Sequence, residues 1–206
     1  MLRRGRQSPR PQTKMAKCTQ FKCNYQDPRR SRAYQQRVIT ALKNPKELFI
    51  TMLSQVRHGT ERSAAIYKEL GESAQNPEIQ EALAARAFVS QQDLAKLDEA
   101  FKLIGEKPVN VTGKLHDVFV EDFRRELAEI QSPEAKRFFV LAKAIHLSHM
   151  RTAEYVALVA AADVSGNHGV GVLLESCLGD HLAFVERTKR LIRHVIEAKI
   201  AARATT

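Results

Sequence analysis

Four side chains in the second half of the chain are of the types that bind metal ions: His149, Cys177, Asp180 and His181. Cys177 precedes His181 by four residues, so the two share one face if this segment is helical. His149 and His181 fall on or beside the apolar stripes of two predicted helices that we expect to be neighbours. Imidazole, thiolate and carboxylate groups together suit a single zinc or copper ion.

Hydrogen bonding offers a simpler role for the two histidines. Each would then be a partly buried side chain bonded to Ser148, Thr60 or Gln91. Spacing alone does not supply the ligand number and geometry that a metal site requires. We favour the hydrogen-bonding role, and therefore expect no metal ligand among the four residues and no resident cofactor.

The other polar residues of these segments form no catalytic pattern. Glu61 and Glu154 are expected to be solvated acids, and His146 and Arg151 are expected on the outer edge of their helix. The sequence contains no serine–histidine–aspartate order, phosphate-binding glycine loop or dinucleotide-binding turn. Hydrolase and nucleotide-binding classes are therefore not supported.

The elements that would position these side chains are long amphipathic helices. Asn-Pro or Ser-Pro pairs at 44–45, 76–77 and 132–133 each place a capping residue before a proline at the first helical position. Gly71, Gly105 and Gly166 stand where helices often end. Apolar residues at three- and four-residue spacing predict helices over 45–70, 77–104, 114–130, 133–162 and 170–202. This layout predicts an all-α fold, an antiparallel bundle of four long helices with an additional short helix.

Charge divides the chain into two parts. Residues 1–43, here called the basic arm, contain 12 lysines and arginines and one acid, Asp27, so that the rest of the chain carries a net −1 of the overall +10. The arm has few large apolar groups and is expected to be largely disordered, whereas residues 44–206 are expected to form the bundle domain. Any nucleic-acid binding would depend on the arm. An inert arm is the interpretation we favour.

Cysteine use and hydropathy point to a reduced, aqueous setting. Three cysteines make no disulfide framework, and the Cys18-x4-Cys23 spacing lacks the second ligand pair of a structural zinc site. No apolar run approaches the ~20 residues of a membrane span. The arginine-bearing N-terminal segment has no apolar core of a secretory signal. We expect a cytoplasmic protein without membrane contact.

Several motifs of residues 44–195 resemble the YciE/YciF-type bacterial ferritin-like family. PKELF at 45–49 and NPEI at 76–79 open the first and second helices as in that family. The sequence LDEAFKLIGEKP at 97–108 is similar to the family pattern Leu-Glu-x-Val-Phe-x-Leu-Leu-Gly-Glu-Lys-Pro. The resemblance implies a ferritin-like fold, an association with stress, and a metal centre between the helices.

The metal ligands that the resemblance implies are missing. Read without gaps, the family's first-helix Glu falls on Thr60, and its second-helix Glu-Glu-Thr-His falls on 88–91, where Phe88 and Gln91 replace Glu and His. Its fourth-helix Glu-His-Tyr-Glu falls on 148–151, which keeps His149 and loses both acids, and its last-helix acids fall on 179–182. A dimetal centre needs carboxylates from facing helices, so we expect that it has been lost.

The sequence therefore predicts a non-catalytic ferritin-like protein. The alternatives are a di-iron or di-manganese oxidoreductase or metal-storage protein, and a nucleic-acid-associated protein acting through the basic arm. Proteins of the family that this chain resembles are often dimers. Apolar residues on two sides of the second and fourth helices (Phe88 and Val89; Phe138 and Phe139) also exceed what one seam needs, so we expect a homodimer.

Overall fold

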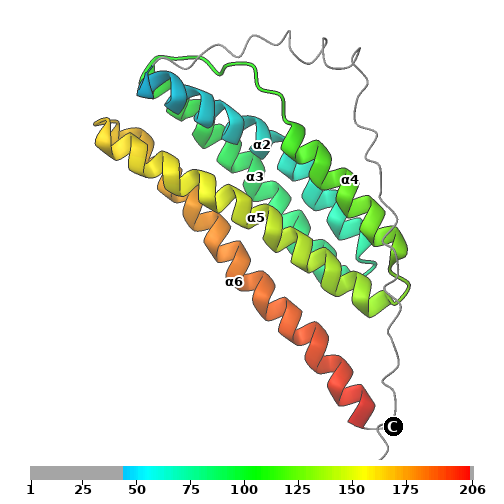
Figure 1. Cartoon of the computed structure of the whole chain (residues 1–206). Coiled ribbons are helices and arrows are strands. Elements are labelled where there is room, and N and C mark those ends of the chain that lie inside the picture. The colour runs from blue at the N-terminus through cyan, green and yellow to red at the C-terminus, as the bar shows by residue number, and fades with distance from the viewer. Residues whose placement is uncertain (1–43, 205–206) are drawn as a thin grey trace, which may run out of the picture. The chain divides into compact units, whose positions relative to one another are not determined.

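The computed structural model describes residues 44–204, with side chains described for 44–195 and Glu197. Within this range the chain forms α2 (Pro45–Ser73), α3 (Pro77–Ile104), α4 (Lys114–Glu129), α5 (Pro133–Val164) and α6 (His168–Ala204), and no strand (Figure 1). The predicted bundle of four long helices and one short helix is confirmed. The predictions for the basic arm lie outside the described residues.

Side-chain caps fix three of the helix starts, as the sequence predicts. Asn44 Oδ1 accepts a hydrogen bond from the backbone N–H of Glu47 at 2.9 Å, and Asn76 Oδ1 accepts one from that of Ile79 at 3.0 Å. Ser132 Oγ begins α5 in the same way, at 3.4 Å from the backbone nitrogen of Ala135. Each cap satisfies one of the N–H groups that a first helical turn leaves without a partner.

The glycine stops are only partly as predicted. Gly105 ends α3 in the left-handed conformation at φ 68°, and Gly166 follows α5 at φ 71°. Gly71 does not end α2, which continues to Ser73. The left-handed residue of that turn is Gln75, at φ 49°. Gly71 instead faces α3, where an added Cβ would already lie 3.4 Å from Cβ of Leu83.

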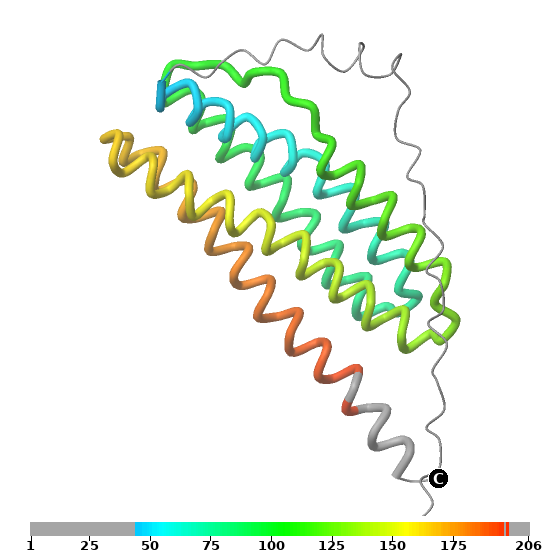
Figure 2. The backbone as a smooth tube through the Cα atoms, in the orientation of Figure 1, coloured from blue at the N-terminus to red at the C-terminus, as the bar shows by residue number. Residues whose placement is uncertain are grey.

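The four long helices pack as a ring of neighbours. Helix α2 packs against α3 and α5, and α6 packs against the other sides of α3 and α5. Figure 2 follows the antiparallel path, in which α3 ends at the opposite end of the bundle from where α5 begins. The connection must therefore run the length of the bundle, and α4 lies within it, in contact with α2 and α5.

The interior holds two apolar clusters, one in each half of the bundle. One includes Phe49, Leu53, Leu97, Tyr155 and Leu174, and the other includes Leu70, Leu83, Phe123, Leu141 and Phe184. Each of the four long helices contributes to both clusters. Every long helix therefore passes from one apolar cluster to the other near its middle.

Several large apolar residues are exposed. Phe138 and Val156 of α5 and Leu115 of α4 each have an exposed fraction of about one half, while Val140, Leu147 and Leu158 of α5 are fully buried. Apolar residues therefore occupy both sides of α5. Phe88 on α3 is 61% exposed.

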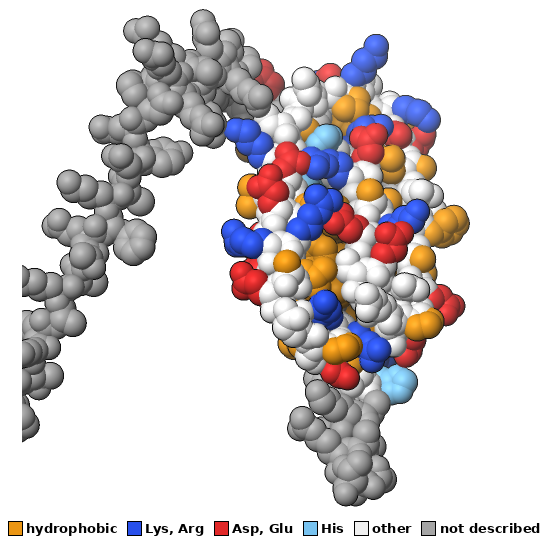
Figure 3. All heavy atoms as spheres, turned by 90° about the vertical axis from the view of Figure 1, so that its right-hand side faces the viewer, with side chains coloured by type: hydrophobic (Ala, Val, Ile, Leu, Met, Phe, Trp, Pro, Cys, Tyr) orange, Lys and Arg blue, Asp and Glu red, His pale blue; other side chains and the backbone are white. Residues whose placement is uncertain are grey.

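The surface of the bundle is mixed in charge. Acidic and basic side chains are interspersed over the face shown in Figure 3 rather than gathered by sign. This agrees with the near-zero net charge of the chain outside the basic arm. None of the helices in the described part of the chain has the length and apolar character needed to cross a membrane.

Candidate functional site: a buried polar layer

Between the two apolar clusters lies a layer of polar and small residues, here called the polar layer. Its members are fully or almost fully buried, and all four long helices supply them: Gly59, Thr60 and Ser63 on α2; Arg86, Ser90 and Asp93 on α3; Ser148 and Arg151 on α5; and His181 on α6. Burying such groups is costly unless they are partnered. We therefore take the polar layer as the candidate functional site.

Arg86 is the centre of one group of contacts in the polar layer. Its Nη2 donates to His181 Nε2 at 2.7 Å and lies 3.2 Å from Asp93 Oδ2. The guanidinium carbon lies 5.7 Å from the ring centre of Tyr67 and 5.9 Å from that of Phe184, within the range of cation–π attraction. One carboxylate and two aromatic faces thus surround a charge that is 3% exposed.

The shorter of two contacts indicates the tautomer of His181. Arg86 Nη2 lies 2.7 Å from Nε2 and 3.2 Å from Nδ1, and a guanidinium can only donate hydrogen bonds, so we assign Nε2 as the acceptor and Nδ1 as the protonated nitrogen. In this assignment Nδ1 donates to Ser148 Oγ at 2.8 Å. Burial, together with the nearby charges of Arg86 and Arg151, lowers the pKa of His181 to about 2. The imidazole is therefore neutral, with the Nε2 lone pair already engaged.

Asp93 joins the polar layer to the surface. Besides Arg86, its carboxylate contacts Lys96 Nζ at 3.3 Å, and the same Nζ lies 2.7 Å from Asp180 Oδ2. Burial raises the pKa of Asp93, although the charges of Arg86 and Lys96 oppose that effect. Asp180, one of the predicted metal candidates, is therefore a half-buried partner of Lys96.

Cys177 lies one helical turn before His181 and is fully buried. Burial, and next the charge of Asp93, raise the pKa of its thiol to about 12. Metals bind the thiolate, and a thiol with so high a pKa stays protonated at neutral pH. Among the residues whose side chains the structure describes, no three of His, Cys, Asp or Glu are grouped so that they could hold a metal ion.

Arg151 is the centre of a second group of contacts, on the α4 side of the polar layer. Its Nη2 donates to His116 Nε2 at 2.8 Å, and its Nη1 pairs with Glu154 Oε2 at 2.7 Å. An added Cβ on Gly59 would overlap the guanidinium, so this glycine makes room for Arg151. Burial and the charge of Arg151 lower the pKa of His116 to about 4, and burial raises the pKa of Glu154.

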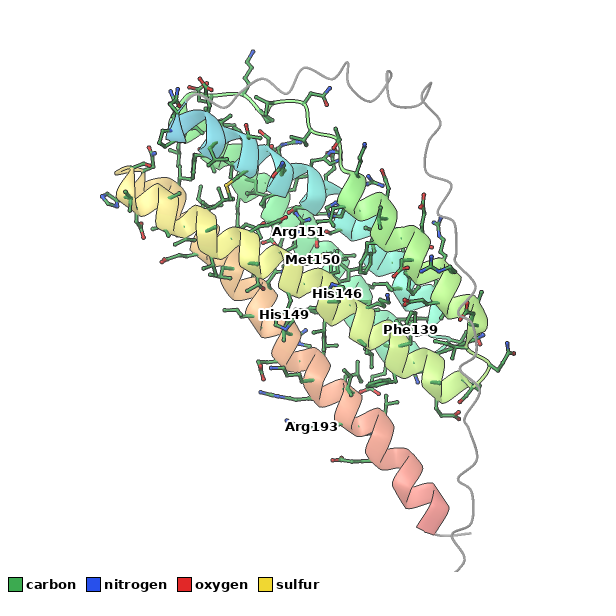
Figure 4. All side chains as sticks on the ribbon, in the orientation of Figure 1. Phe139, His146, His149, Met150, Arg151 and Arg193 are labelled. Carbon is green, nitrogen blue, oxygen red and sulfur yellow. The ribbon has the colours of Figure 1, made fainter. Side chains whose placement is uncertain are left out.

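The structure separates the four sequence-predicted candidates. Cys177 and His181 share the buried face of α6, but His149 is exposed on α5, so its placement on or beside an inward stripe is wrong. The predicted hydrogen bond between His181 and Ser148 is confirmed. Arg151 was expected on the outer edge and is instead buried, on the side of α5 away from His149 (Figure 4).

Other expectations for single residues divide in the same way. Glu61 and His146 are exposed as expected, but Glu154 is half-buried against Arg151 rather than solvated. Sequence reasoning missed Arg86, Asp93 and His116 altogether. A signal was present for the first two, because Leu83, Arg86, Ser90, Asp93 and Leu97 follow one another at three- and four-residue spacing.

Comparison with known proteins assigns the chain to a family. Residues 44–204 match the family model described as "Domain of unknown function (DUF892)". The chain belongs to this family. No curated protein matches the sequence significantly.

Solved structures of similar fold include the E. coli stress protein YciF, with a TM-score of 0.71, 17% identity, and coverage of 75% of this chain and 98% of that one. YcfI from Rhodopseudomonas palustris has a TM-score of 0.70 at 20% identity and covers 73% of this chain and 96% of its own. A protein from Xanthomonas campestris pv. campestris has a TM-score of 0.62 at 17% identity, with 78% and 99% covered. The resemblance to the YciE/YciF-type family and the ferritin-like fold are confirmed.

Burial differs among the residues that the gap-free reading aligned with the family's metal ligands. Thr60, Ser148 and His181 are buried in the polar layer. Phe88 and Gln91 on α3 are exposed and do not face this layer. The inward polar residues of α3 are Arg86, Ser90 and Asp93.

Proposed function

We propose that this chain is a non-catalytic ferritin-like protein in which buried arginines take the place of a dimetal centre. The observation that carries the proposal is the Arg86 guanidinium, bonded to both Asp93 and His181 inside the polar layer. A dimetal centre of this fold needs carboxylates and histidines from all four helices. The polar layer has one carboxylate and two fixed cations, Arg86 and Arg151, and this set does not fit a pair of divalent metals.

Electrostatics supports the same conclusion. A divalent ion in this layer would be repelled by guanidiniums that cannot lose their charge. The groups that could still coordinate a metal are already engaged. His181 Nε2 accepts a hydrogen bond from Arg86, and Asp93 pairs with Arg86 and Lys96. On α3 the buried polar residues are Arg86, Ser90 and Asp93, and of these Asp93 alone is of a type that binds iron or manganese. Oxidation chemistry that depends on paired metals is therefore not expected of this protein.

We include a role in the stress response in this proposal, and similarity of fold is its sole support. One protein of similar structure is the E. coli stress protein YciF. With Arg86 and Arg151 in its polar layer, the bundle would need no metal ion to reach its folded state. Such a protein would act through its surface, and homodimerisation through the exposed apolar faces of α3 and α5 is part of the proposal.

Elemental analysis of the full-length protein tests the proposal. Protein purified from metal-replete cells should contain far less than one iron, manganese, zinc or copper per chain. Added Fe(II) should be oxidised in air no faster with the wild type than with an Arg86→Met variant. Two irons or two manganese ions per chain would refute the proposal.

One zinc or copper per chain would also refute the absence of a resident metal, and variants would locate it. Cys177→Ser would remove such an ion bound at the buried face of α6. His149→Gln is the matched control, because His149 is exposed. Loss of metal in the Cys177 variant alone would assign the ion to Cys177 and His181.

A further inference from the structure

A cavity of about 200 Å³ opens on the α4 side of the bundle. Its wall is formed by α2, the link that follows α3, the first turn of α4, and α5. The polar side chains that line it include His58, His116, Arg151 and Glu154. The cavity shares Arg151 with the polar layer but none of the contacts of the Arg86 group, so anion binding here and the metal content of the protein are tested by separate measurements.

Arg151 lines the cavity with unused hydrogen-bonding capacity. Its side chain is 1% exposed, and its Nε lies buried without a hydrogen-bond acceptor among the described residues. Its Nη1 forms the ion pair with Glu154, but makes no hydrogen bond of good geometry with any of the described residues. A buried donor without an acceptor is unfavourable. The guanidinium is thus suited to an acceptor that enters the cavity.

The first turn of α4 forms another part of the wall. This helix has 16 residues and begins after Gly113, which lies at φ 57° and has no side chain to cap the turn. The N-terminal end of a helix carries N–H donors and a partial positive charge that favour an anion. An added Cβ on Gly113 would overlap the His58 imidazole, so the glycine lets His58 lie against the link.

The charged side chains that line the cavity favour an anion, with one exception. Arg151 and Lys114 line it as cations, and Glu154 is the one acid among its lining residues. Arg62 stands beside it, where its guanidinium pairs with Asp117 and donates to the carbonyl oxygen of Gly113.

We propose that this cavity binds a small oxyanion, such as inorganic phosphate. The anion would lie between the first turn of α4 and the Arg151 guanidinium, with His58 as a further donor. A volume of about 200 Å³ admits an ion of a few heavy atoms and excludes a nucleotide. Glu154 limits the affinity, because its carboxylate competes for the same guanidinium.

Titration of full-length, isotope-labelled protein with inorganic phosphate, at ionic strength held constant with chloride, tests this proposal. Backbone resonances of residues 113–116 and the His58 ring should shift and saturate. A parallel titration with acetate distinguishes a carboxylate ligand from a tetrahedral one. Shifts confined to the basic arm, or shifts that do not saturate at the cavity, would overturn the proposal.

Variants with opposite expected effects make the test specific. Glu154→Gln removes a repelling charge a few ångströms away and should tighten phosphate binding by roughly tenfold, since such a charge pair is worth more than 1 kcal/mol near a protein surface. Arg151→Gln should abolish binding, and His58→Gln should weaken it, whereas the exposed His149→Gln should change nothing. If Arg151→Gln does not fold, the Glu154 and His58 variants decide. Unchanged affinity in Glu154→Gln overturns the proposal.

Discussion

Two buried histidines should make this bundle sensitive to mild acid. Acidification from about pH 7.5 to about pH 5 is expected to lower the free energy of unfolding by about 4 kcal/mol through His116 and His181 alone. Both imidazoles are almost fully buried, and a guanidinium donates to each, Arg151 to His116 and Arg86 to His181. A protonated imidazole would have to give up that hydrogen bond and face the positive charge.

The magnitude follows from the difference between folded and unfolded pKa values. The folded-state pKa is about 4 for His116 and about 2 for His181, both below the ordinary value of 6.5. At pH 5 the unfolded chain therefore binds nearly one proton at each histidine, while the folded chain binds almost none. Each group then favours the unfolded state by about 2 kcal/mol, and the loss begins as the pH falls through about 6.5.

Urea denaturation over this pH range measures the effect, with single variants to isolate each group. His116→Gln and His181→Gln should each remove about half of the pH dependence between pH 7.5 and 5. His149→Gln should keep all of it, because His149 is exposed on α5. If His181→Gln retained the full wild-type slope, His181 would not be a neutral acceptor of Arg86, and the tautomer derived above would be wrong.

Four further predictions concern stability and assembly. Asp93→Asn should destabilise the bundle by about 3 to 5 kcal/mol in urea denaturation, because it removes the carboxylate that neutralises buried Arg86, and the double variant with Arg86→Met and Asp93→Leu should recover most of the loss. Gly59→Ala should cost about 1 to 3 kcal/mol by crowding Arg151, whereas Gly179→Ala, with open space around it, should stabilise by about 0.5 to 1 kcal/mol. Light scattering should give twice the 23.2 kDa mass of one chain, and a monomer mass would refute the homodimer. In filter-binding assays at ~150 mM salt the full-length protein should not retain nucleic acid, and retention that disappears on deletion of the basic arm would show that the arm binds it.

Local signals in the sequence were sufficient to predict the helices. The Asn-Pro and Ser-Pro pairs act within one turn, and α3 has the predicted bounds 77–104. The end of α2 was misjudged because Gly71 could serve either as a stop or as a point of close approach to α3. Only the packed helices distinguish these roles.

The polar layer was harder to predict because polarity and burial conflict there. An apolar residue is the usual occupant of a buried stripe, so Arg86 and Asp93 on α3 were not predicted to face inward. Both are nonetheless buried. They pair with each other along α3, and Arg86 has a further partner, His181 on α6, which the sequence does not display.

The polar layer also fixes how the helices are aligned along their length. A slide of α3 by one turn, about 5.4 Å, would move Arg86 and Asp93 away from the level of His181 and toward an apolar cluster. Two apolar clusters alone would tolerate such a slide with modest loss, because leucines and phenylalanines substitute for one another. Arg86 and Asp93 lie on the same helix and would move together, but Arg86 would leave its partner on α6, His181. The hydrogen bond between Arg86 and His181 therefore favours the native register over others of similar hydrophobic energy, much as a single buried polar residue fixes the register of a coiled coil.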